Sequence, residues 1–336
     1  MELNIQNLPD LVRNAEILWQ MGKESVPNVM RGSGLVKEIS IPQMTGNTRE
    51  FSEIDLEEYA KFKGESDQTA RAKVQQGYSK TATLYRVGLT IGISYELRTQ
   101  GKYFEIKSKL TNLGAVVPNR LDLDLAHRFT FGTATSYTDQ DGRTVDTTIG
   151  DTYQLFHTAH TLRGSSTTFR NRLANNPQFS RGGLEAMEKM RVENSFNQFG
   201  QKMAGMTDDI LWTTDDPNTI NTVKEILRST SNPTQNNNGV VNTYQGKYRH
   251  VILPRVATDK DGAIDSTKAK YWGVASSKYS TFYLGVHEEA HLVSPTAGSN
   301  AEEFSTQDWQ FGSWGGFLMC AVSGGWIGFS SGDATA

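Results

Sequence analysis

Apolar residues near the amino terminus predict a helical arm. They recur three and four positions apart, which is the spacing of one helix face. The face consists of Leu11, Ala15, Leu18 and Trp19. Asp10 precedes these residues and is a candidate N-cap, and Gly32-Ser33-Gly34 predicts the break that follows. Residues 1–38 are therefore expected to form an arm with little core of its own.

Two β-rich segments enclose a charged stretch in residues 36–93. The flanks, Lys37–Ile41 and Leu84–Ile91, are typical of strands, whereas the stretch between them has too few large apolar residues to close a core. If the flanks pair with arms of about 20 residues, the hairpin reaches roughly 60 Å. A compact chain of this length has a radius of gyration of only about 20 Å. We therefore expect residues 39–93 to be a projecting extended loop, and the alternative is a disordered surface loop.

A projecting two-stranded ribbon is only marginally stable alone, so this loop is expected to lie on a neighbouring molecule. Charged side chains in its central part are the candidates for contacts between subunits. These candidates are Glu57, Glu58, Lys61, Lys63, Arg71 and Lys73.

A long helix is predicted after the loop, between about Ser94 and Phe131. Its apolar positions are again three and four apart and comprise Leu110, Leu113, Val117, Leu121 and Leu125. Gly114 and Pro118 interrupt the pattern and predict a kink or a break near Val117. Asp122 and Asp124 are two positions apart and would face different directions on a helix, which disfavours a shared metal ion.

The second half of the chain mixes helical and strand patterns, so the predicted fold class is mixed α+β. Helices are predicted at about 184–199, after Gly182-Gly183 and with Phe196 in the core face, and from Asp216-Pro217 onwards. Strands are predicted at 209–214, 248–256 and 271–275, as a pair at 281–286 and 290–293, and as two carboxyl-terminal strands joined by a Gly-rich bend.

Composition excludes several classes of protein. The 34 basic and 37 acidic residues nearly cancel, so the chain lacks the basic footprint of a dedicated nucleic-acid binder. A single cysteine, Cys320, excludes an intrachain disulfide and is expected to be a small buried hydrophobe. Acidic residues interrupt the amino-terminal segment, which argues against a signal peptide, and no run of about 18 apolar residues predicts a membrane span.

One motif suggests a metal-dependent enzyme. The segment His287-Glu288-Glu289-Ala290-His291 matches H-E-x-x-H, which on a helix places two imidazoles on Zn²⁺ beside a glutamate base. The residues before it, however, predict a strand, in which the two histidines would lie about 13 Å apart and could not share one metal ion. A zinc metallopeptidase using His287, Glu288 and His291 is therefore only a remote alternative.

Other polar clusters carry weaker signals. Asp139–Asp146 and Asp259–Asp265 resemble the start of a calcium loop, but both lack the terminal glutamate and fit hairpin turns. His157 and His160 are expected to be ordinary hydrogen-bonded side chains. We expect no catalytic residue, no metal ion and no cofactor.

Four segments carry a resemblance to a known family. They are RVGLTIGISYELRTQG (86–101), ILWTTDDPNTINTVKEILRS (210–229), KYWGVASSKYSTFYLGVHEEAHLVSP (270–295) and STQDWQFGSWGGFLMCAVSGGWIGF (305–329). With the order of arm, charged hairpin, long helix, mixed α/β region and returning strands, they resemble the major capsid proteins of tailed bacteriophages with the Hong Kong 97-type fold, among which the Mu-like major head proteins look most similar. The likeness covers almost the whole chain and lies in arrangement more than in invariant motifs.

The resemblance implies a division of the chain and a function. Residues 1–38 would be the N-arm and 39–93 the extended loop; 94–132 with about 279–315 would be the peripheral domain with its spine helix, and 133–278 with about 316–336 the axial domain. The chain would not be an enzyme. It would assemble in the bacterial cytoplasm into pentamers and hexamers of a virion capsid, an icosahedral head that encloses double-stranded DNA and contacts it non-specifically.

The expected partners follow from the same resemblance. Many relatives begin with a long scaffolding segment, whereas this chain starts with Met1 and reaches the loop within about 40 residues, so a separate scaffolding protein is expected, along with a portal and, optionally, a decoration protein. Covalent crosslinking through Lys61, Lys63, Lys73 or Lys80 is not expected, because lysines in a charged loop are ordinarily solvated or paired. The alternative function is an encapsulin-like compartment shell, which copurifying cargo protein would reveal.

Overall fold

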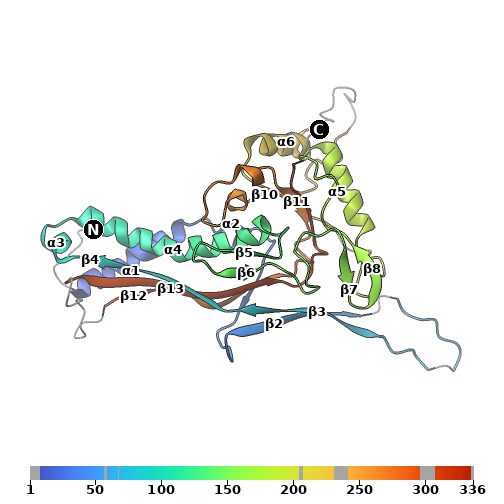
Figure 1. The fold of residues 1–336 in the computed structure, drawn as a ribbon, viewed down its shortest axis with the longest axis horizontal. Helices are drawn as coiled ribbons and strands as arrows, with labels where there is room; N and C mark the ends of the chain where they lie inside the picture. Colours follow the sequence, from blue (N-terminus) through green and yellow to red (C-terminus); the bar gives the residue numbers. More distant parts are fainter. Residues whose placement is uncertain are drawn as a thin grey trace.

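The computed structural model describes residues 8–56, 59–66, 68–203, 207–230, 241–295 and 307–333. The fold is mixed α+β, as the sequence predicts. Figure 1 shows an elongated part, which contains the longest helix and the longest strands, beside a compact part, with a two-stranded hairpin projecting below the compact part.

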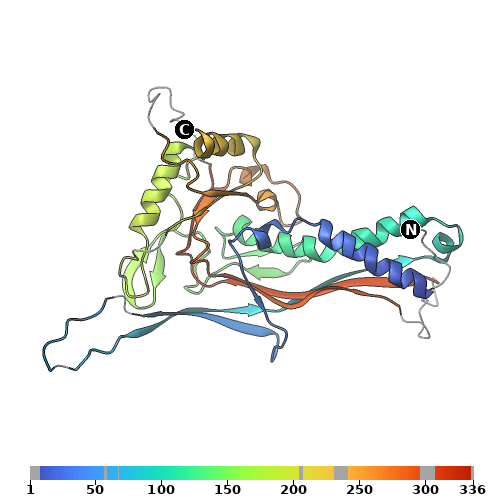
Figure 2. The same ribbon diagram turned by 180° about the vertical axis from the view of Figure 1, so that it is seen from behind.

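The elongated part is a four-stranded sheet with helices on one face. Its strand order is β1 (Lys37–Ser40), β12 (Phe282–Val293), β13 (Trp309–Ala321) and β4 (Tyr85–Ile93). The helices are α1 (Leu8–Ser25), α2 (Val29–Gly32), α3 (Tyr95–Thr99) and α4 (Tyr103–Thr130). Figure 2 shows α1 lying along α4 on the same side of the sheet. The predicted apolar face of the arm is confirmed, since Leu11, Ala15, Leu18 and Trp19 are all buried.

The longest helix confirms its predicted apolar face but not the predicted break. Leu110, Leu113, Val117, Leu121 and Leu125 are all buried. The helix continues through Pro118, because it is packed on both sides of that residue: Leu110 and Leu113 lie in a cluster with α1, and Leu121 and Leu125 lie in a cluster with β12 and β13. Gly114 has a different role: a Cβ there would collide with the carbonyl oxygen of Trp19, and a Cβ on Gly22 would collide with that of Thr111. These two glycines let the backbones of α1 and α4 touch.

Replacing Gly114 by Ala is expected to lower the free energy of unfolding by about 1–3 kcal/mol, because the added methyl group pushes α1 away from α4. This loss outweighs the gain of up to about 1 kcal/mol that Ala has over Gly in a helix. The matched control is Gly182→Ala, also in a helix, where an added Cβ meets no atom within 4 Å. Urea unfolding of both variants measures the effect, and equal stability would show that the helices do not need this close approach.

The compact part is built on a second sheet. Its strand order is β10 (Arg249–Ile252), β9 (Ile210–Thr213), β11 (Trp272–Ala275) and β14 (Ile327–Ser330). Helices α5 (Arg181–Glu193) and α6 (Pro217–Arg228) and the 3-10 turns η2 (Pro254–Ala257) and η3 (Ser266–Lys268) surround it. Two small hairpins complete it: β5 (Ser136–Thr138) with β6 (Thr144–Asp146), and β7 (His160–Leu162) with β8 (Ser165–Phe169).

An aromatic cluster joins the two parts. Phe129, near the carboxyl end of α4, is fully buried, and its ring centroid lies 5.4 Å from that of Trp212 in β9 and 5.8 Å from that of Phe282 in β12. The rings of Phe156 and Trp326 lie 6.1 and 6.5 Å away. Aromatic pairs at these separations add to the stabilisation from buried area, so the cluster makes α4 and the β9 sheet pack as one body.

Several local predictions were wrong, each because tertiary contacts decided the outcome. Asp10 lies in the first turn of α1 rather than before it. Helix α5 ends at Glu193 rather than 199, because the Asn194 side chain donates to the Met190 carbonyl and Phe196 pairs with Lys202 in a β-bridge. The expected strand pair at 281–286 and 290–293 is one strand, β12, which bends at two register shifts beside β13.

The two flanks of the loop do not pair with each other, contrary to the sequence prediction. Strand β1 pairs with β12, and β4 pairs with β13, so the flanks are strands of the elongated sheet and are separated by two others. The hairpin is instead made of β2 (Thr48–Leu56) and β3 (Val74–Thr83). The projecting ribbon is therefore shorter than the proposed range of 39–93.

Candidate assembly surfaces

The H-E-x-x-H segment does not have the geometry of a metal site. His287–His291 lies on strand β12 rather than on a helix. The His287 Nδ1 atom is 3.0 Å from the Ile41 carbonyl oxygen, while His291 Nδ1 is 3.7 Å from the Glu288 carboxylate. Across the described ranges, no group of three or more His, Cys, Asp or Glu side chains could hold a metal ion.

The other polar clusters have structural explanations. Asp139 accepts hydrogen bonds from the backbone of Asp141 and Arg143 and is paired with Arg120 and Arg143, so its carboxylate holds a hairpin turn. Asp259 accepts from the backbone N–H groups of Asp261 and Ala263 in the same way. Asp122 and Asp124 pair with different arginines, Arg255 and Arg120, as their spacing predicts.

Two further predictions concern a buried thiol and a pair of histidines. Cys320 is 4% exposed, and burial raises the pKa of its thiol to about 12, so it is an inert hydrophobe as expected. His160 is fully buried, and its two ring nitrogens lie 2.7 Å from Asp151 Oδ2 and 3.2 Å from Asn171 Oδ1. His157 Nδ1 accepts from the Ala159 N–H group, so both histidines are hydrogen-bonded side chains.

The root of the hairpin is fixed to its own subunit by an apolar contact. Phe51 of β2 is buried and stacks on Tyr283 of β12 with ring centroids 5.0 Å apart. It belongs to a cluster with Ile41, Ala82, Leu318, Cys320 and Val322. The hairpin thus begins as a firmly packed layer on the elongated sheet.

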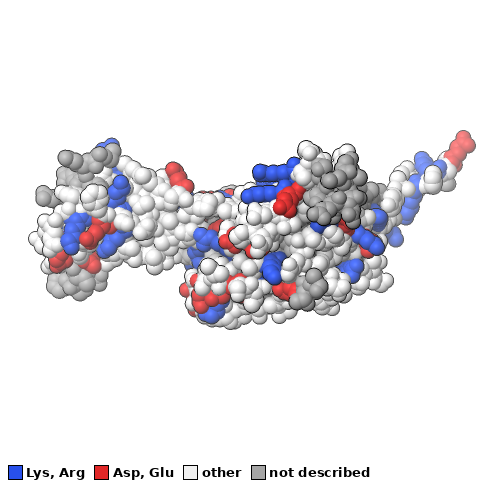
Figure 3. All heavy atoms as spheres, turned by 90° about the horizontal axis from the view of Figure 1, so that it is seen from above, with Lys and Arg blue, Asp and Glu red and all other residues white. Residues whose placement is uncertain are grey.

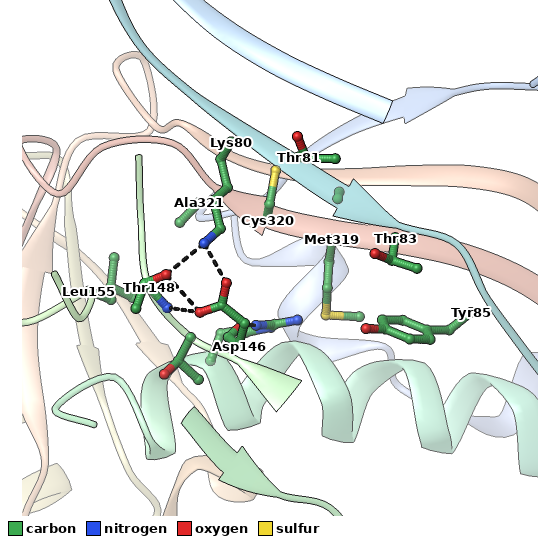
Figure 4. A pocket seen from close by; sticks show the side chains of 13 residues that line it. Lys80, Thr81, Thr83, Tyr85, Asp146, Thr148, Leu155, Met319, Cys320 and Ala321 are labelled. Carbon is green, nitrogen blue, oxygen red and sulfur yellow. Dashed lines mark hydrogen bonds and ion pairs between the residues drawn. The ribbon is translucent and has the colours of Figure 1, made fainter. Parts of the chain in front are cut away.

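Polar contacts add to this anchor. The Lys80 ammonium lies 2.6 Å from both Asp146 Oδ2 and Thr148 Oγ1, at the edge of a pocket of about 100 Å³ (Figure 4). Lys80 is therefore paired within its own chain. Farther along β3, the Tyr78 hydroxyl lies 2.8 Å from Thr161 Oγ1, and Arg163 donates to the Gly77 carbonyl at 2.9 Å.

Glu53 is a titratable group in this anchor. It lies opposite a bulge at Gly77, its carboxylate accepts from the Gln198 amide at 3.3 Å, and Lys37 on β1 and Asp55 on its own strand are its charged neighbours. Burial raises the pKa of Glu53 to about 7, although hydrogen bonds from Ser323 and Gln198 and the charge of Lys37 oppose the shift. The packed root therefore favours protonated Glu53.

We expect the folded subunit to lose stability as the pH rises from about 4.5 to about 7 through this residue. Glu53 ionises less readily in the folded chain than in the unfolded chain, so its ionisation lowers the free energy of unfolding. The full loss for such a pKa shift is about 3 kcal/mol. Glu53→Gln should remove this dependence, so its stability should change less between pH 5 and pH 8 than that of the unmodified chain. Urea unfolding measures both, with Glu50→Gln on the exposed side of β2 as control. Parallel pH dependences for all three proteins would contradict the assignment.

The far end of the hairpin is exposed. Residues 59–66 and 68–73 are all solvent-exposed, with Tyr59 58% exposed and Phe62 completely so. Of the predicted contact residues, Lys61, Lys63, Arg71 and Lys73 lie on this tip, and Glu57 and Glu58 lie outside the described residues. Figure 3 shows mostly basic side chains along the projecting hairpin and an acidic one at its end.

The two faces of the hairpin beyond its root differ. Asp55 and Gln75 are paired across the strands and face the body, where Asp55 accepts from the Gln198 backbone N–H at 2.9 Å. Ile54, Val74 and Gln76 lie on the opposite face, where Ile54 is 69% and Val74 is 63% exposed. This apolar face was not predicted, although the alternation of Ile54 and Val74 with Asp55 and Gln75 is a signal of two different faces.

No helix in the described ranges is long and apolar enough to cross a bilayer.

Comparison with known proteins finds similarity in three-dimensional arrangement alone. No protein-family model and no curated protein matches the chain. Among solved structures, it is similar to the bacteriophage PhiM1 mature capsid (13% identity, 89% of this chain and 85% of that chain, TM-score 0.49). It is similar to the capsid of cyanophage P-SCSP1u (11%, 88% and 85%, 0.47) and to a virus-like particle from Pyrococcus furiosus (9%, 95% and 98%, 0.46).

Proposed function

We propose that this chain is a major capsid protein, which assembles through pentamers and hexamers into the icosahedral head of a tailed bacteriophage around double-stranded DNA. The observation that carries the proposal is the hairpin. Its root is packed on its own subunit, while its tip and one apolar face, with Ile54 and Val74, are exposed.

The hairpin has the reach to contact a second copy. Beyond Asp55 and Gln75 the chain runs out and back through residues 56–74, and half of that length at about 3.3 Å per residue spans roughly 30 Å. A two-stranded ribbon with exposed apolar residues is only marginally stable in water. Packing on another copy would bury Ile54, Val74 and Phe62 and thereby stabilise both the ribbon and the assembly.

The rigidity of the subunit is suited to a protein shell built from many copies. The aromatic cluster around Phe129 makes the two parts one rigid body, so an interface at one end fixes the direction of the other. When every copy repeats the same two contacts, donating a hairpin and receiving one, the contact is heterologous and generates a ring if the rotation closes. Rings of five and six such copies are the expected units of the shell.

The charge balance suits containment rather than specific DNA recognition. A net charge of −3 supplies no strong attraction for phosphates, so contact with packaged DNA would be non-specific and weak. In this role the chain has no enzymatic activity. Its partners would be other copies of itself, a separate scaffolding protein, a portal and, optionally, a decoration protein, and its location would be the virion capsid.

Sedimentation velocity of the purified chain, alone and coexpressed with its genomic neighbours, tests this function. A capsid protein should sediment as capsomers or as closed particles with many copies. Nuclease-protected DNA in particles from infected cells would support the phage head, whereas a copurifying enzyme would favour the encapsulin-like alternative. A monomer under every condition would contradict both.

A further inference from the structure

A small pocket lies beside the root of the hairpin, where four segments of the chain meet. Its walls come from β3, from α4, from β6 with the residues that follow it, and from β13. Its volume is about 100 Å³, whereas one water molecule needs only about 10–15 Å³. Figure 4 shows Lys80, Tyr85 and Asp146 around this space. The contacts of the proposed shell do not use it.

Arg128 gives the pocket a charge that the chain does not neutralise. It belongs to the last turn of α4 and lines the pocket. Its Nη1 atom donates to the backbone carbonyl of Asp146, whereas its Nε atom is buried and has no hydrogen-bond partner. No carboxylate in the described ranges lies within ion-pair distance of it. A buried N–H group of a charged side chain is destabilising when it lacks an acceptor, so an acceptor at this point would stabilise the fold.

Asp146, the carboxylate among the lining residues, is already occupied. Its Oδ1 atom accepts from the backbone N–H and the hydroxyl of Thr148 at 2.8 and 2.7 Å. Its Oδ2 atom lies 2.6 Å from Lys80 Nζ. The charges of Asp146 and Lys80 therefore compensate each other, and the positive charge of Arg128 remains.

Two further donors line the same space. The Tyr85 hydroxyl is directed toward the other labelled side chains in Figure 4, and it has no hydrogen-bond partner in the described part of the chain. The guanidinium of Arg143 lies 3.8 Å from the centre of the Tyr85 ring and holds it in place. An ammonium has three N–H donors, and Lys80 uses two of them, for Asp146 and Thr148. The unused polar groups of the pocket are thus mainly donors.

We propose that this pocket binds one free inorganic oxyanion of the phosphate or sulfate class. Such an ion has the opposite charge to Arg128, and its several oxygens can accept from Arg128, Tyr85 and Lys80 at the same time. A water molecule would accept from these donors but would not neutralise the guanidinium. A phosphate of nucleic acid carries a sugar on two of its oxygens, for which a pocket of about 100 Å³ has no room.

The bound ion would strengthen the anchor of the hairpin. Lys80 belongs to β3 and Arg128 to α4, so an ion that contacts both joins the hairpin root to the longest helix. Leu155 and Met319 form apolar parts of the wall, which lower the local dielectric constant and strengthen the attraction between the ion and the guanidinium. A ligand that binds the folded chain and not the unfolded chain raises the stability of the fold.

Thermal unfolding of the full chain tests this site. We expect sodium phosphate to raise the midpoint by about 2–4 °C over sodium chloride at equal ionic strength. Phosphate also stabilises proteins in general, because it is excluded from their surfaces, so a variant must separate the two effects. Arg128→Gln should lose the specific rise, whereas Arg13→Gln, at an exposed arginine of α1, should keep it. Equal effects of phosphate on the unmodified chain and on Arg128→Gln would overturn the proposal.

Tyr85→Phe keeps the proposal testable if Arg128→Gln fails to fold. It removes only a hydroxyl that has no partner in the described residues, so we expect a folded chain that binds phosphate about threefold more weakly, or weaker still, in titration calorimetry. The control is Tyr95→Phe, at an exposed tyrosine of α3, which should bind phosphate as the unmodified chain does. Undiminished binding by Tyr85→Phe would overturn the assigned set of donors.

Short duplex DNA at the same concentration of phosphate groups distinguishes the two sources of phosphate. We expect it to cause no rise in the midpoint that depends on Arg128. A rise with DNA that is lost in Arg128→Gln would overturn the assignment to a free ion.

Discussion

Replacing residues 57–73 by an Asn-Gly turn is expected to give a stable subunit that no longer assembles. The two-residue turn suits the register in which Leu56 pairs with Val74, so β2 and β3 and the packed root remain intact. The deleted segment contains the exposed tip, so we expect the midpoint of thermal unfolding to change by less than about 3 °C. The contact with a second copy is lost entirely, and electron microscopy should find no closed shells.

The control for this deletion is another exposed hairpin turn, in which Lys260 and Asp261 are replaced by Ala. That variant should form shells as the unmodified chain does. Normal shells from the shortened hairpin would refute the role assigned to the tip. An unfolded product would mean that the tip stabilises its own subunit, which its exposure argues against.

Replacing Phe129 by Ala is expected to lower the free energy of unfolding by about 3–5 kcal/mol. Phe129 is fully buried, and its ring contacts aromatic side chains from both parts of the subunit, so its removal leaves a cavity at their junction. We also expect poorer assembly, because α4 would no longer be held firmly to the β9 sheet.

Phe104→Ala is the matched control, with the same substitution in the same helix at a residue that is 90% exposed. It should change the free energy of unfolding by less than about 0.5 kcal/mol. Urea unfolding followed by circular dichroism measures both variants. A loss below 1 kcal/mol for Phe129→Ala would mean that the aromatic cluster is not what joins the two parts.

Local periodicity was enough to predict the elements whose burial is decided within one segment. The apolar face of α4, the buried strand β9 and the helix α6 opened by Asp216-Pro217 all follow from spacing and capping. The Asp216 side chain accepts from the Thr219 N–H group at 2.9 Å, as an N-cap should.

Non-local pairing could not be predicted in this way. Nothing within Lys37–Ile41 indicates that it pairs with β12, whose partner residues lie 246 positions later (Lys37 with Tyr283), so local patterns alone predict that the two nearest β-rich flanks pair with each other. Gly114 shows the same limit. A glycine inside a helix lowers the stability of that helix, and its presence at position 114 is explained only by the close approach of the partner helix α1. Glycines within strands, such as Gly88 and Gly312, are a sign of close approach. Only the strand order shows that the group approaching both of them is the Trp314 ring.

Electron microscopy of the purified, unmodified chain, with and without a coexpressed scaffolding protein, tests whether the chain assembles into a shell. We expect closed icosahedral particles, or tubes and sheets of capsomers, in which the hairpin of each copy lies over the next. Uniform monomers or dimers under every condition, with the hairpin free in solution, would contradict it.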